Sequence, residues 1–141
     1  MARKRPVISE VSHGLYAPFE KRGKSLPEHL TFTTAVPPEV GQEFGYILNI
    51  KHGRGLRIGF EIAHPRIPDT DGRVMAPFVG EEFVNTNDFD FFLGDALWAP
   101  LDNMLGAWTL TTRLDGKVVA QRTFDVAYPP AIPAWEDLPM Q

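Results

Sequence analysis

Residues 108–126 read Trp-Thr-Leu-Thr-Thr-Arg-Leu-Asp-Gly-Lys-Val-Val-Ala-Gln-Arg-Thr-Phe-Asp-Val. β-branched and aromatic residues favour extended strands, and Asp115-Gly116 divides the stretch into two such runs. A two-residue type I′ turn needs a left-handed backbone at both centre positions, which Asp-Gly tolerates well. The stretch therefore predicts a β-hairpin. In the return run, 117–126, Arg122 shares a face with apolar residues, so we expect a bulge or a sheet edge there.

A period of two also governs the chain before this hairpin. In residues 43–51 and again in 56–64, apolar side chains occupy alternate positions. The opposite face holds Glu43, Asn49 and Lys51 in the first run, and Arg57, Gly59, Glu61 and Ala63 in the second. The link 52–55 is His-Gly-Arg-Gly, and glycine allows the positive φ angles of tight turns, so this pair is predicted to form a second hairpin. Further strands are expected over residues 7–16 and 29–36.

The remaining segments complete an all-β pattern. Residues 78–98 are predicted to form one or two strands, and 100–105 a single helical turn. About seven or eight strands separated by turn residues indicate a single antiparallel β-sandwich of the immunoglobulin-like type. We expect a basic N-terminal arm over residues 1–6, the sandwich domain over 7–127 and a proline-rich tail over 128–141, whose prolines favour an extended polyproline path.

Composition and charge exclude several classes of protein and of binding partner. The chain has 141 residues, a length that suits one domain, and its 43% apolar and 23% charged residues are typical of globular proteins. The absence of cysteine excludes disulfide scaffolds and thiolate sites. Residues 69–102 carry eight carboxylates against Arg73 alone, which disfavours binding to nucleic acid. No run approaches the roughly 20 apolar residues of a membrane span, so we expect a cytoplasmic protein without nucleic-acid or membrane partners.

No catalytic or cofactor-binding motif is present. None of the three serines lies in a Gly-x-Ser-x-Gly sequence, and no glycine-rich phosphate loop precedes a helix. Asp88 and Asp90 would share a strand face and thereby offer an acid–base pair. Charges that keep an aromatic strand soluble are the simpler interpretation of these two aspartates. The sequence therefore indicates a non-catalytic protein that needs no cofactor.

Three hypotheses of binding remain open. The leading one is a protein-interaction or structural module that contacts a partner or another copy through the apolar residues of its tail, Ile132, Trp135 and Leu138. The alternative is a small-ligand or metal-binding protein whose polar site lies at one end of the sandwich and uses His64, Asp69 and Asp71. A third hypothesis, an anionic partner, rests on two basic clusters. These clusters comprise Arg3, Lys4, Arg5, Lys21, Arg22 and Lys24.

The chain also resembles a bacterial family known as DUF3859, a domain of unknown function. The residues that carry the resemblance are Gly14-Leu-Tyr16, the stretch 37–45, His64-Pro65 before Asp71-Gly72, and the closing stretch from Leu105 to Val126. They cover about residues 7–127. Because most of these are turn and core residues, the resemblance implies an immunoglobulin-like fold and implies no activity.

Overall fold

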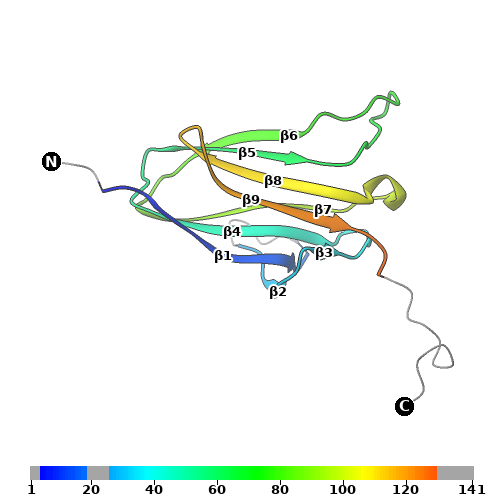
Figure 1. Ribbon diagram of the computed structural model, residues 1–141, viewed down its shortest axis with the longest axis horizontal. Coiled ribbons are helices and arrows are strands. Elements are labelled where there is room, and N and C mark those ends of the chain that lie inside the picture. The colour runs from blue at the N-terminus through cyan, green and yellow to red at the C-terminus, as the bar shows by residue number, and fades with distance from the viewer. Residues whose placement is uncertain (1–3, 19–25, 130–141) are drawn as a thin grey trace, which may run out of the picture.

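The computed structural model describes residues 4–18 and 26–129, which form nine strands in two facing layers (Figure 1). The one helical element in these ranges is a short 3-10 turn, and no helix there is long and apolar enough to cross a membrane. The elements are β1 (Val7–Tyr16), β2 (His29–Thr31), β3 (Ala35–Val36), β4 (Glu43–Lys51), β5 (Arg57–Ala63), β6 (Phe78–Phe83), β7 (Asp88–Ala96), η1 (Leu101–Met104), β8 (Gly106–Leu114) and β9 (Lys117–Val126).

The layers are two separate sheets. The first has the strand order β2-β1-β4-β7 and is antiparallel throughout. The second has the order β3-β9-β8-β5-β6, in which β3 runs parallel to β9, so this sheet is mixed. The predicted sandwich is confirmed, with one or two more strands than expected and this one parallel pair.

The hairpin that decided the fold is confirmed. β8 and β9 pair antiparallel around Asp115 and Gly116, whose φ angles of 53° and 87° are those of a type I′ turn. The expected bulge is present as well. Thr112 pairs with Ala120 and Arg113 with Val118, which leaves Val119 between them without a partner on β8.

Two predictions of local structure are wrong. Residues 52–55 do not close a hairpin, because β4 belongs to the first sheet and β5 to the second. Residues 29–36 are two strands instead of one, since the chain leaves the first sheet after Thr31 and enters the second at Ala35. The alternation of side chains is the same whether the next strand lies beside its neighbour or across the sandwich. The sequence period alone therefore does not distinguish a hairpin from a connection between the two sheets.

The core fills the space between the sheets. The inward residues of β4, which the alternation predicted, are at most 1% exposed, and they face the inward residues of β8 and β9. The ring of Phe44 lies 5.4 Å from the rings of both Trp108 and Phe124. The largest buried side chains of these three strands are Phe44, Tyr46, Leu48, Ile50, Trp108, Leu110 and Phe124.

A row of glycines crosses three strands of the first sheet. Gly14 of β1 pairs with Gly45 of β4, which pairs with Gly94 of β7. A Cβ atom on Gly45 would lie 2.1 Å from the carbonyl oxygen of Leu93, and one on Gly14 would lie 1.8 Å from that of Thr31. At these positions the backbone approaches a neighbouring backbone more closely than any side chain allows.

Candidate functional site

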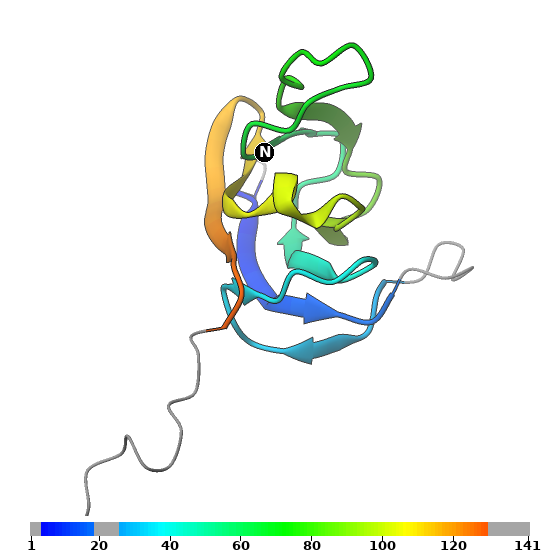
Figure 2. The same ribbon diagram turned by 90° about the vertical axis from the view of Figure 1, so that its right-hand side faces the viewer.

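Two strands have open edges on the same side of the sandwich. β3 pairs with β9 only at Asp125 and Val126, and β2 pairs with β1 only at Leu15 and Tyr16. In the described ranges the preceding part of each strand has no strand partner on that side. β1 and β9 lie next to each other there, as Figure 2 shows in blue and orange.

The hydrogen bonds to β3 show which backbone groups of β9 face this edge. Asp125 N–H donates to the Thr34 carbonyl (2.8 Å) and Ala127 N–H to the Val36 carbonyl (3.2 Å). Because successive residues of a strand turn their backbone groups to opposite sides, the N–H and C=O groups of Thr123 and Gln121 point to the same side. There they meet no other strand of the described chain. The open edge of β9 thus runs from the bulge at Val119 to Asp125.

A pocket of about 210 Å³ lies between the two strands. Apolar side chains from both sheets form much of its lining, together with one carboxylate, one guanidinium and one amide. We call this pocket and the open edge of β9 the β1/β9 groove. The pocket is lined by Ile8, Glu10, Tyr46, Leu48, Val119, Ala120, Gln121 and Arg122.

A charged pair bridges the groove. Arg122 donates from Nε to Glu10 Oε1 at 2.9 Å and from Nη2 to Glu10 Oε2 at 2.6 Å, so the pair is bidentate. Glu10 Oε1 also lies 3.0 Å from Nδ1 of His13. The guanidinium has five N–H donors, and Glu10 takes two of them. Arg122 therefore keeps donors for a ligand that enters the groove.

The tyrosine that lines the groove is not a candidate base. Tyr46 is 1% exposed, and its hydroxyl is 2.6 Å from Oγ1 of Thr112. Burial raises the pKa of Tyr46 to about 12, against a partial lowering by the Thr112 hydrogen bond. The Gln121 amide donates to Oγ1 of Thr111 at 2.9 Å. The Tyr46 hydroxyl and the Gln121 amide are thus both engaged in hydrogen bonds within the protein.

His64, a residue of the alternative ligand site, follows the end of β5. Its ring lies 4.7 Å from that of Phe78 and 5.8 Å from that of Trp108. Nδ1 is 2.7 Å from the Pro65 carbonyl oxygen and Nε2 is 2.9 Å from that of Ala76. Both ring nitrogens therefore face backbone carbonyls of the connection between β5 and β6.

The two aspartates of the same hypothesis lie in a turn within that connection. Asp69 Oδ1 accepts hydrogen bonds from the backbone N–H groups of Asp71 (2.8 Å) and Arg73 (2.9 Å). Asp69 thereby closes the Pro-Asp-x-Asp-Gly turn in the way that aspartate commonly does. Across residues 4–18 and 26–129, no three His, Cys, Asp or Glu side chains lie together as metal ligands would.

The aspartate pair on β7 is held by polar neighbours. Nδ2 of Asn49 donates to Asp88 at 2.7 Å and to Asp90 at 2.9 Å, and Lys51 lies 3.1 Å from Asp88. The Asn49 hydrogen bond, followed by that of Lys51, lowers the pKa of Asp88. A carboxyl group with a lowered pKa is a poor proton donor at neutral pH, so the solubilising interpretation suits this pair.

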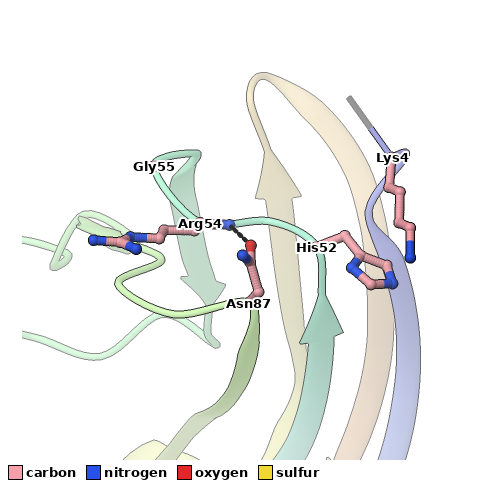
Figure 3. A pocket seen from close by; sticks show the side chains of 5 residues that line it. All are labelled: Lys4, His52, Arg54, Gly55 and Asn87. Atoms are coloured by element: carbon pink, nitrogen blue, oxygen red, sulfur yellow. Dashed lines mark hydrogen bonds between the residues drawn. The ribbon is translucent and has the colours of Figure 1, made fainter. Parts of the chain in front are cut away.

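Basic residues line a second pocket, of about 490 Å³, at one end of the sandwich (Figure 3). Lys4 and His52 lie on one side of the loop there, and Arg54 extends to the other side. Of the proposed anionic-partner clusters, Lys4 and Arg5 are described, whereas Arg3, Lys21, Arg22 and Lys24 lie outside the described residues. The tail residues Ile132, Trp135 and Leu138 also lie outside them.

Sequence reasoning missed the β1/β9 groove. One signal of it was present, because Arg122 occupies an otherwise apolar face of its strand. An inward arginine needs a carboxylate partner from the facing sheet, and Glu10 supplies it. The identity of this carboxylate depends on contacts between residues far apart in the chain. The alternation of side chains within one strand gives no information about such contacts.

Comparisons with known proteins agree with this fold. A crystal structure of an immunoglobulin-like protein from Pseudomonas aeruginosa matches with a TM-score of 0.73. The match covers 90% of this chain and 100% of that one at 18% sequence identity, which establishes similarity of fold. No curated protein sequence matches the chain. A family model described as a domain of unknown function (DUF3859) matches residues 4–126. The chain therefore belongs to the DUF3859 family.

Proposed function

We propose that this protein is a non-catalytic interaction module that binds an extended segment of a protein partner in the β1/β9 groove. The observation that carries the proposal is the open edge of β9, which lies directly beside a pocket lined by both sheets. An added strand would receive backbone hydrogen bonds from Gln121 and Thr123. This mode of recognition, in which a peptide extends an existing sheet, is widespread among small β domains.

The open edge of β9 carries only some of the features that protect edge strands. Proteins block exposed edges with proline, very short strands, bulges or inward-pointing charges, and β9 has the bulge at Val119 and the inward-pointing Arg122. β9 has ten residues, no proline and one exposed lysine at its start, and the exposed Val118 lies near that end. β7, by contrast, carries Asp88 and Asp90 at the open edge of the first sheet. The difference supports β9 as the edge that accepts a partner.

The side chains of the pocket set the chemistry of the ligand. Ile8, Leu48 and Ala120 favour an apolar side chain, whereas the remaining donors of Arg122 favour a carboxylate. We propose that the partner segment carries both, at positions that share one face of a strand. We also propose a bacterial, cytoplasmic setting, with which the absence of cysteine agrees.

Two variants of Gln121 test this function. A displayed library of random dodecapeptides is selected against the whole protein, and the affinity of the selected peptides is then measured for each variant. Gln121→Pro removes a backbone N–H on the open edge, where proline is tolerated. Gln121→Ala removes the same side-chain bond to Thr111 and keeps the N–H.

We expect the selected peptides to bind the wild type and Gln121→Ala with similar affinity. Gln121→Pro should weaken binding at least about tenfold, a loss of about 1.4 kcal/mol. Circular dichroism of both variants checks that they remain folded. Equal binding to the folded Pro and Ala variants would show that the peptides occupy another surface, and the proposed function would be rejected.

A further inference from the structure

We infer that the β1/β9 groove is sensitive to pH, because protonation of His13 strengthens its binding of an acidic partner segment, and this inference rests on the proposed function. His13 lies on β1, three residues after Glu10, and its Nδ1 is 3.0 Å from Glu10 Oε1. Imidazole side chains ordinarily gain and lose their charge between pH 5 and 8. The charged pair that bridges the groove therefore has a third, titratable member.

One oxygen of Glu10 is shared by two basic groups. Oε1 accepts from Nε of Arg122 at 2.9 Å and lies 3.0 Å from Nδ1 of His13. At this distance from a carboxylate, Nδ1 carries the hydrogen in either charge state of the ring, so a second proton is added at Nε2. With the ring neutral, one carboxylate faces one cation. With the ring protonated, the same carboxylate faces two cations, and the group carries an excess of positive charge.

The excess charge lies where a ligand carboxylate would bind. Glu10 and Arg122 line the pocket of the groove. The side chains of His13, Glu10 and Arg122 are 21%, 32% and 32% exposed, and partly buried charges are screened less than fully exposed ones. A protonated His13 that attracts Glu10 leaves more of the Arg122 charge uncompensated. A carboxylate of the partner segment then binds the remaining donors of Arg122 more tightly.

The strands beside β1 bring several titratable or charged groups near His13. On β4, Tyr46 lies directly opposite His13, and burial raises the pKa of Tyr46 to about 12, so its hydroxyl is neutral below pH 8. Glu43 is three residues from Tyr46 on the same strand and points to the opposite face of the sheet. β9 contributes Arg122, which stays charged throughout, and β3 (Ala35–Val36) has no titratable side chain.

β2 contributes a second imidazole, that of His29. Its Nε2 is 2.8 Å from the backbone carbonyl oxygen of His13. The rings of His13 and His29 both contact Phe32, at 5.4 and 4.2 Å between ring centres. His29 therefore contacts the backbone of His13, whereas the His13 ring contacts the Glu10 carboxylate. A response to pH that arises at this carboxylate depends on His13 and not on His29.

The affinity of the selected dodecapeptides at pH 7.5 and at pH 5.5 tests this inference. Acidic peptides without histidine are used, since their carboxylates are ionised at both pH values. We expect the wild type to bind them at least about threefold more tightly at pH 5.5, the effect of one partly exposed charge. The gain should shrink at high salt. His13→Gln should remove the gain, and His29→Gln, the matched control, should retain it.

Equal wild-type affinity at the two pH values would overturn the inference, as would a gain that His13→Gln retains. A second measurement needs no protein variant. Peptides whose acidic residues are replaced by their amides should bind the wild type equally at both pH values, and a gain that they share would also overturn the inference. None of these outcomes affects the proposed function, which is read at pH 7.5 from the response of peptide binding to Gln121→Pro. Circular dichroism at both pH values checks that the variants remain folded.

Discussion

The guanidinium of Arg122 and the carboxylate of Glu10 join the two sheets across the open side of the sandwich, although 112 residues separate them in the chain. The contact is bidentate, with donor–acceptor distances of 2.9 and 2.6 Å. Both side chains are about one third exposed. The pair thus links β1 to β9 and remains partly accessible to solvent.

Removal of this pair should cost little stability. Arg122→Gln or Glu10→Gln should each lower the free energy of unfolding by about 0.5–1 kcal/mol at low salt, since partly exposed ion pairs are screened by water. Urea denaturation at low and at high salt measures the effect, which should shrink at high salt. The exchanged variant, Glu10→Arg with Arg122→Glu, should recover part of the loss. A loss that is independent of salt would show that packing, and not charge, is the main contribution.

The glycine row should tolerate no side chain. Gly45→Ala should lower the free energy of unfolding by about 3 kcal/mol or more, because the methyl group meets the Leu93 carbonyl and the backbone φ of 153° is strained for alanine. Gly59→Ala is the control, since a Cβ atom there has no neighbour within 4 Å. It should change stability by less than about 1 kcal/mol. Similar losses for both variants would contradict the close approach of β4 and β7.

Stability should fall in strongly alkaline solution because of Tyr46. Its pKa is raised from 10.0 to about 12 in the folded protein, so the unfolded chain loses the proton first. The contribution of protonated Tyr46 to stability is complete below pH 10 and is lost as the pH rises through 12.

Tyr46→Phe should be less stable by about 1–3 kcal/mol at pH 7, since Thr112 loses its partner. Its stability should depend less on pH between 10 and 12, as measured by urea denaturation. A wild-type slope that persists in Tyr46→Phe would assign the effect to another group, such as Tyr16, whose pKa is also raised by burial.

Asp95 should oppose folding at neutral pH. Desolvation raises the pKa of this carboxyl group, while a hydrogen bond from Ala96 N–H and the charge of His64 lower it in part. Because the pKa of Asp95 is raised in the folded state, the protonated carboxyl group contributes to stability in acid. This contribution is lost as the pH rises through the raised pKa. Asp95→Asn keeps an oxygen for Ala96 and should be more stable than the wild type at pH 7 but not at pH 3. Chemical denaturation at both pH values measures the difference, and a variant less stable at pH 7 would show that the charge is favourable.

The sequence predicted which residues form strands better than it predicted which strands pair with each other. The bounds of β1, β4 and the β8–β9 hairpin follow from alternation and from Asp115-Gly116, which are local signals. After Lys51 the chain crosses from the first sheet to the second, which the sequence did not predict. The glycines of the link 52–55 suit a hairpin and a connection between sheets equally well. The groove was missed because Glu10 and Arg122 meet only after both sheets have formed. The strands could therefore be predicted from local periodicity, whereas the β1/β9 groove depends on long-range packing of the two sheets.

The most direct test of strand addition at β9 is amide exchange of the whole protein, measured by NMR at Gln121 and Thr123 of the open edge. Rates are measured with and without a saturating selected peptide. Without peptide, Gln121 and Thr123 should exchange much faster than Arg122, whose N–H faces β8; with peptide, both should become as protected as Arg122. If the peptide binds and leaves the exchange of Gln121 and Thr123 unchanged, no strand is added at this edge and the proposed function is wrong.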